Sequence, residues 1–176
     1  PDDPWSYIGY WGDHQIIYLL KLLELSNDFH PDRLLALLGR PVFSYANVPY
    51  RIKSFESLLE DAKNTVVYDQ EAAQRIEQRV AEKGADGRLV LDQEGEVYGV
   101  NLAEKLLVAL LGKLGNFVLG GGIWLNTQRP EWNDANNAIV GNGLSMVTVY
   151  YMRRFVAFLQ GLLATHSGTV EVSREV

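Results

Sequence analysis

The chain has 176 residues, with 22 acidic side chains against 16 lysines and arginines, a formal charge of -6 and 47% apolar residues. This length and composition are typical of one globular unit with its own hydrophobic core, and they exclude an intrinsically disordered chain. Because the sequence contains no cysteine, disulfides, thiolate catalysis and cysteine-ligated zinc are also excluded.

Helical periodicity begins early in the chain. Residues 13–25 carry apolar side chains nearly all round a helix, which predicts a helix that is buried on most sides. A break follows, and Pro31 precedes a short predicted helix over residues 32–38 that Gly39 closes, so these two helices form a hairpin. Residues 40–49 include two prolines and no helical period, which predicts a loop lying across a surface.

The middle of the chain mixes helices with a less regular stretch. One face of a predicted helix is formed by Ile52, Phe55, Leu58, Leu59 and Ala62. Residues 71–83 are good helix formers with a glutamine- and glutamate-rich outer side, so this helix faces solvent. Residues 84–99 suit a small hairpin or an irregular insertion.

Two further helices are predicted in the last part of the chain. Asn101 caps a helix that begins at residue 102, and the glycines of residues 112–122 weaken and end it. A long loop over residues 123–143 follows, then a final helix over residues 144–163 and a polar tail from His166 that we expect to be frayed. About six helices and little strand indicate an all-α fold of antiparallel helical hairpins, with function concentrated in the long loops.

Several partners and sites are disfavoured by the same sequence. An acidic chain without a basic stripe does not suit nucleic acid, and the apolar stretches are too short or too interrupted to span a membrane. His14 stands beside Asp13, but the other two histidines lie in unrelated contexts, so we expect neither a metal site nor a cofactor. The cellular compartment stays open, with the cytoplasm slightly favoured.

The long loop has an unusual composition. Residues 122–137 combine two tryptophans, two carboxylates and several side-chain amides. Carbohydrate sites use flat aromatic rings to stack sugars, amides and carboxylates to bind hydroxyls, and a carboxylic acid to protonate the leaving oxygen. The alternative reading is a helix cap beside a tryptophan of the core, because Asp and Asn are common in turns.

The order of residues in this loop is more specific than its composition. The run Glu131-Trp132-Asn133-Asp134-Ala135-Asn136-Asn137, followed by Val140-Gly141, resembles the D-W-N-D-G-M-N…V-G motif of the cellobiose-phosphorylase-like inverting glycoside phosphorylases. Upstream, the run Gly12-Asp13-His14-Gln15-Ile16-Ile17-Tyr18-Leu19 is similar to that family's D-D-H-L-W-L segment, and Gly122-Ile123-Trp124 takes the place of its H-G-L.

The resemblance covers residues 10–159 and implies the later part of an (α/α)6 barrel, so we expect residues 1–176 to be a single segment of a catalytic domain cut from a longer chain. It also implies that Asp134 is the general acid and that Asp13 binds a hydroxyl of the donor sugar. The residues expected to bind substrate are Asp13, His14, Trp124, Arg129, Glu131, Trp132 and Asn133.

The identity of the nucleophile is left open by the resemblance. Phosphate would need no protein base, whereas water would need one, with the two carboxyl groups about 6.5–9.5 Å apart in an inverting enzyme. The motif also departs from the family at Glu131, Ala135 and Asn136, which bears on the range of substrates.

A non-catalytic carbohydrate-binding or scaffold protein is the remaining alternative. The expected partners are an oligosaccharide, inorganic phosphate in the phosphorylase alternative, and the rest of the barrel or a second copy.

Overall fold

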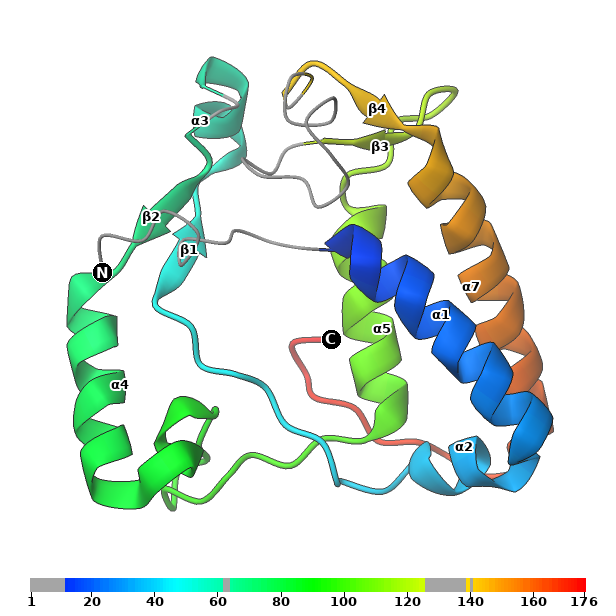
Figure 1. Cartoon of the computed structure of the whole chain (residues 1–176), viewed down its shortest axis with the longest axis horizontal. Coiled ribbons are helices and arrows are strands. Elements are labelled where there is room, and N and C mark those ends of the chain that lie inside the picture. Colours follow the sequence, from blue (N-terminus) through cyan, green and yellow to red (C-terminus); the bar gives the residue numbers. More distant parts are fainter. Residues whose placement is uncertain (1–11, 62–63, 126–138, 140) are drawn as a thin grey trace.

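The computed structural model describes residues 12–61, 64–125, 139 and 141–176 (Figure 1). About 55% of the structure is helical, with a few short strands, which confirms a mostly helical chain. The helices are α1 (Gly12–Phe29), α2 (Pro31–Leu37), α3 (Phe55–Glu60), α4 (Gln70–Lys83), the 3-10 helix η2 (Gly84–Arg88), α5 (Leu102–Leu114) and α7 (Met146–Thr165). The strands are β1 (Tyr50–Ile52), β2 (Val66–Tyr68), β3 (Ile123–Trp124) and β4 (Leu144–Ser145).

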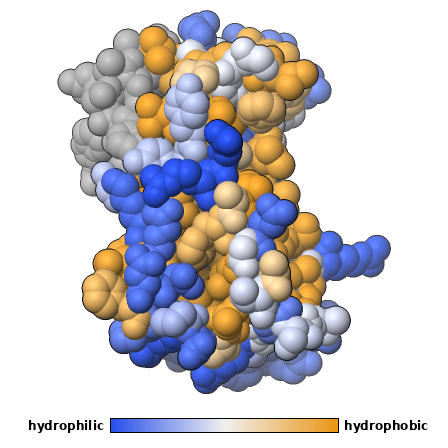
Figure 2. All heavy atoms as spheres, turned by 90° about the vertical axis from the view of Figure 1, so that its right-hand side faces the viewer, coloured by the Kyte–Doolittle hydropathy of each residue, from blue (hydrophilic) through white to orange (hydrophobic). Residues whose placement is uncertain are grey.

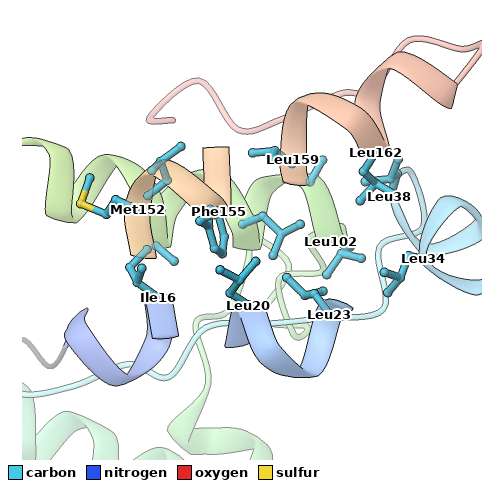
Figure 3. Packing of buried hydrophobic residues seen from close by; sticks show 14 of the residues in the cluster. Ile16, Leu20, Leu23, Leu34, Leu38, Leu102, Met152, Phe155, Leu159 and Leu162 are labelled. Carbon is cyan, nitrogen blue, oxygen red and sulfur yellow. The ribbon is translucent and has the colours of Figure 1, made fainter. Parts of the chain in front are cut away.

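Three long helices, α1, α5 and α7, pack on one another on one side of the molecule (Figure 1). Ile16, Leu20 and Leu23 of α1 lie along α7 in the same order as Met152, Phe155 and Leu159 (Figure 3). The helices α1 and α7 therefore run parallel to each other, and α5 runs in the opposite direction (Figure 1).

The core is a continuous apolar cluster between these three helices and α2. At the centre, Phe155 is 1% exposed and Leu20 is fully buried. Each large apolar side chain removed from water contributes about 1.5–3 kcal/mol, so this cluster is the main source of stability in the described part of the chain.

The prediction that the first helix is buried on most sides was wrong. Leu22 and Leu25 are 64% and 54% exposed, whereas Ile16, Leu20 and Leu23 are buried. The reason is that α2, α5 and α7 cover one side of α1, and no described element covers the other. Apolar residues also lie between polar ones on the surface viewed from the side of α7 (Figure 2).

The hairpin of α1 and α2 agrees with the sequence prediction. Pro31 occupies the first turn of α2, where its missing N–H costs nothing. Residues 40–49 then form the predicted loop, which is tied down by antiparallel bridges from Phe43 to Val100 and from Ala46 to Leu89.

An arm built from β1, α3, β2 and α4 lies on the other side of the molecule (Figure 1). The antiparallel pair β1–β2 aligns Tyr50 with Tyr68 and Ile52 with Val66. Ile52 therefore belongs to a strand, and the prediction of a helical face starting there was wrong. The helix α3 begins only at Phe55, because Ser54 accepts a hydrogen bond from the N–H of Ser57 and caps it.

The solvent-facing helix predicted over residues 71–83 is α4, which has no buried residue. Its C-terminal end is covered by η2, where a Cβ atom on Gly87 would collide with the backbone of Arg79 and Val80. The following stretch is a minimal hairpin, with a bridge from Leu91 to Val97 around a turn at Gly95 that has a φ of 80°. Glycine adopts this conformation without steric cost.

The tail that was expected to be frayed is ordered, and this prediction was wrong. After α7 the chain returns along α5 (Figure 1). The amide of Asn101 donates to the carbonyl of Glu171, and Val170 packs against the core cluster. These long-range contacts offset the entropy cost of ordering a polar segment.

No helix within the described ranges combines the length and the apolar character required to cross a membrane.

Candidate functional site

A two-stranded ribbon holds both ends of the segment that contains the sequence motif. In it, Ile123 pairs with Ser145 and Trp124 with Leu144. Beyond the strands, the N–H of Leu125 donates to the carbonyl of Gly143 at 3.0 Å, and the N–H of Gly141 donates to the carbonyl of Leu125 at 2.6 Å. The described residues on the two sides of the motif, Leu125 before it and Gly141 and Gly143 after it, are therefore held together at the end of the ribbon.

The helix α7 begins directly at the end of this ribbon. Ser145 is its N-cap residue, and the Ser145 hydroxyl accepts a hydrogen bond from the N–H of Thr148 at 3.2 Å. The final helix therefore starts at Met146 instead of the predicted residue 144, because Leu144 and Ser145 are paired in β4.

Three successive glycines connect α5 to the ribbon in a tight turn. Gly120 has a φ of 73°, and the N–H of Val118 bonds the carbonyl of Gly122 at 2.8 Å. A Cβ atom on Gly122 would lie 3.0 Å from the carbonyl oxygen of Ser145. Glycine is thus required where the backbone reverses and where the two strands approach each other.

The residues predicted to do the chemistry fall mostly outside the described residues. These are the general acid Asp134 and the substrate-binding candidates Arg129, Glu131, Trp132 and Asn133. Asp13 and His14 lie in the first turn of α1, where the structure describes the backbone and not the side chains. The beginnings of α1 and α7 lie toward the same end of the helical layer as the ribbon (Figure 1).

Trp124 is the one predicted substrate-binding residue whose side chain is described. Its indole N–H donates to the carbonyl of Gly141 at 3.0 Å. Its ring meets the ring of Phe55 edge to face, with the centroids 6.3 Å apart. The polar edge of this tryptophan is therefore used to fix the returning end of the motif segment.

A second polar cluster, which the sequence analysis did not identify, surrounds the carboxylate of Glu104 on α5. This residue is only 3% exposed. Its carboxylate accepts hydrogen bonds from the hydroxyl of Tyr45 at 3.1 Å and from the N–H and hydroxyl of Ser173 at 2.7 and 2.8 Å. Both oxygens have partners, as a buried carboxylate requires.

The surroundings of Glu104 change the ionisation of its neighbours. Burial, followed by the hydrogen bond to Glu104, raises the pKa of Tyr45 to about 12. Burial lowers the pKa of Lys105, whose ammonium group lies 4.0 Å from the centre of the Tyr45 ring and donates to the carbonyl of Ser44. No signal in the sequence distinguished Glu104 from an exposed helical glutamate, because its partners come from distant segments.

An open hollow of about 630 Å³ lies beside this cluster and is bordered by Tyr45, Tyr98, Val108 and the C-terminal segment. The hydroxyl of Tyr98 is 2.9 Å from that of Ser173, at the wall of the hollow. Since the groups around Glu104 satisfy one another, the cluster joins the C-terminal segment to α5 and does not resemble a reactive centre.

Within the described ranges, no three His, Asp or Glu side chains lie close enough to hold a metal ion. Comparison with known proteins found no family model and no curated protein that matches this chain.

Proposed function

We propose that the chain is part of an enzyme that cleaves glycosidic bonds with inversion of configuration, with Asp134 as the general acid. The proposal rests on the resemblance of the Glu131–Asn137 run and the Gly12–Leu19 run to two motifs of the cellobiose-phosphorylase-like enzymes. It includes an (α/α)6 barrel as the architecture of the complete catalytic domain.

The observation that supports it most directly is the anchoring of the motif segment. Hydrogen bonds between Leu125, Gly141 and Gly143 bring the two ends of this segment together. Flanking residues that are held together by backbone hydrogen bonds suit a catalytic group in the sequence between them, because catalysis requires the group to be positioned before the reaction.

The parallel arrangement of α1 and α7 also supports the proposal. The first turn of α1 carries Asp13 and His14, and it lies toward the same end of the helical layer as the beginning of α7, the first helix after the motif in the sequence (Figure 1). Parallel neighbouring helices are the arrangement that the inner ring of a helical barrel requires.

In the proposed reaction, Asp134 donates a proton to the glycosidic oxygen as the bond to the anomeric carbon breaks. A nucleophile attacks that carbon from the opposite face, which inverts its configuration. The sugar would be bound by Asp13, His14, Arg129, Glu131, Trp132 and Asn133. Trp124 would take part indirectly, because its indole N–H holds the carbonyl of Gly141, which closely follows the motif in the sequence.

The test compares the complete protein with its Asp134→Asn variant on a panel of β-linked glucosides and related oligosaccharides, with and without phosphate. Asparagine is isosteric but cannot donate the proton, so we expect turnover to fall at least about 100-fold. The matched control is Asp28→Asn, which changes an exposed aspartate at the end of α1 and should leave turnover unchanged.

The products distinguish the alternatives. Release of a sugar 1-phosphate only when phosphate is present would establish a phosphorylase. Release of free sugar without phosphate would establish a hydrolase, in which Glu131 or another acid activates water. Undiminished turnover in Asp134→Asn would overturn the assignment of the general acid, and sugar binding without any turnover would indicate a carbohydrate-binding or scaffold protein.

The proposal includes a partner for the apolar surface that the described elements leave open. Leu22 and Phe29 of α1 and Tyr150 of α7 are all more than half exposed. In the proposed barrel such residues would be covered by further helices of the same domain or by a second copy of the chain. Sedimentation of the isolated chain would detect self-association.

A further inference from the structure

A polar hollow of about 290 Å³ lies on the arm of the molecule, between β1 and α4. Three arginines from two elements line it: Arg51 on β1, and Arg75 and Arg79 on α4. The two arginines of α4 are four residues apart, so they lie on the same face of the helix. The one acidic residue in the wall is Asp69.

The framework of this hollow is fixed by backbone and capping contacts. Asp69 is the N-cap residue of α4 and accepts a hydrogen bond from the N–H of Ala72 at 2.9 Å. Its own N–H donates to the carbonyl of Pro49, and the N–H of Asn47 donates to the carbonyl of Arg88. The strand and the helix that carry the arginines are therefore held in place before any ligand binds.

The positive charges of the hollow are only partly neutralised. Arg51 lies 3.3 Å from a carboxylate oxygen of Asp69. Arg75 is 3.7 Å from Glu71, which is 89% exposed and outside the wall of the hollow, so this ion pair contributes little. Among the described residues, the half-buried Arg79 forms no ion pair.

The ionisation of Asp69 agrees with this arrangement. The N–H of Ala72, followed by the charges of Arg51 and Arg75, holds the pKa of Asp69 below its ordinary value. Asp69 is therefore charged at neutral pH, and the wall carries three positive charges against one negative charge. In a chain with a formal charge of -6, this is a local site where an anion is attracted.

A second hollow of about 400 Å³ shares Asn47, Val48, Tyr50 and Ile76 with the first. Its wall includes Tyr50 and Tyr68, whose ring centroids are 6.0 Å apart. The charged groups in this wall are one glutamate, Glu77, and one arginine, Arg88. Aromatic rings of this kind can accept the apolar face of a sugar ring.

We propose that these two hollows together bind an acidic saccharide, with its carboxylate, sulfate or phosphate group on Arg75 and Arg79 and its ring against Tyr50 and Tyr68. Guanidinium groups bind such anions through paired, charge-assisted hydrogen bonds. The choice of a saccharide rests on the proposed function, whereas the choice of an anion rests on the arginines. The residues of this site are not those of the motif, and the role that we assign to them is to select or retain the substrate.

The test is an NMR-detected titration of the full chain with methyl β-D-glucuronide, with methyl β-D-glucoside as its neutral match. We expect the glucuronide to shift amide signals of β1 and α4 and to bind about tenfold more tightly or better. The preference should weaken as salt is added, because the arginines are close to solvent. Equal affinity for the two glycosides, or a preference that salt does not change, would overturn the proposal.

Variants locate the site. The double variant Arg75→Gln/Arg79→Gln should lose the preference, and Arg33→Gln/Arg153→Gln, which removes the same charge from exposed positions on α2 and α7, should keep it. A preference that survives in the first variant would contradict this placement. If inorganic sulfate alone binds as tightly as the glucuronide, the saccharide part of the proposal is wrong.

Because this titration measures binding without turnover, its result is independent of the general acid. The Asp134→Asn variant should bind the glucuronide as the unaltered chain does. Loss of turnover in this variant with retained glucuronide binding would support both proposals. Loss of turnover in the variant, together with no glucuronide preference in the unaltered chain, would contradict this proposal alone, and retained turnover in the variant would contradict only the assignment of the general acid.

Discussion

The buried carboxylate of Glu104 accepts hydrogen bonds from both the backbone N–H and the hydroxyl of Ser173, at 2.7 and 2.8 Å. These two residues are 69 positions apart in the chain. Their contact joins the first turn of α5 to the C-terminal segment. The hydroxyl of Tyr45 donates a further hydrogen bond to the carboxylate. One buried acid thus connects three distant segments.

Replacing Glu104 by glutamine should destabilise the chain by about 1–3 kcal/mol, because the amide nitrogen would face hydrogen-bond donors and leave one of them unsatisfied. Urea unfolding measures the loss. Hydrogen exchange at the N–H of Ser173 should accelerate in the same variant. The exposed substitution Glu82→Gln on α4 is the matched control. Unchanged exchange at Ser173 would contradict the conclusion that Glu104 holds the C-terminal segment against α5.

Stability should fall between about pH 10 and pH 12 because of Tyr45. Its pKa is raised to about 12 in the folded chain, whereas an unfolded tyrosine ionises near pH 10. The stabilisation from the neutral phenol is therefore complete below pH 10 and is lost as the pH rises through 12. The lowered pKa of Lys105 acts in the opposite direction at lower pH, and its effect is complete once the pH reaches the ordinary lysine value of 10.5.

The Tyr45→Phe variant isolates this effect, since it keeps Lys105 and the aromatic ring and removes only the titrating hydroxyl group. The stability difference between the unaltered chain and this variant, measured by urea unfolding from pH 8 to pH 12, should shrink with rising pH. The same comparison with Tyr150→Phe, which changes an exposed tyrosine of α7, controls for general alkaline effects. A difference that stays constant would contradict the raised pKa of Tyr45 in the folded chain.

Two glycine-to-alanine substitutions should have opposite effects. Gly87→Ala places a methyl group into the backbone of Arg79 and Val80, and it should destabilise the chain by about 1–3 kcal/mol because neither segment can yield easily. Gly161→Ala lies within α7, where a Cβ atom meets nothing within 4 Å. It should stabilise the chain by up to about 1 kcal/mol through helix propensity. Thermal unfolding of both variants would check the two signs together.

Trp124→Phe should loosen the anchoring of the motif segment. Phenylalanine retains an aromatic ring beside Phe55 and lacks the N–H that donates to Gly141. We expect a loss of about 1 kcal/mol and faster hydrogen exchange at the N–H of Gly141. Phe55→Leu, which removes the ring contact and retains the indole, serves as the comparison. Equal exchange rates at Gly141 in the two variants would argue against the indole bond as the anchor.

The sequence predicted the helices because their signals are local. The cap at Asn101, the proline that opens α2 and the polar surface of α4 depend on residues within one or two turns, and each is confirmed. The motif that suggests carbohydrate chemistry is also local. The role of Asp134 stays a prediction, because that residue lies outside the described part of the chain.

Only the tertiary structure decided which surfaces are buried and which polar groups meet. Leu20 and Leu22 are equally apolar, yet Leu20 is fully buried and Leu22 is 64% exposed, because burial depends on where α7 packs. The hydrogen bonds from Ser173 to Glu104 likewise join residues far apart in the sequence. The same is true of Arg51 and Arg79, which line one hollow. Local patterns determine helices, whereas such contacts are fixed by the packing of the whole chain.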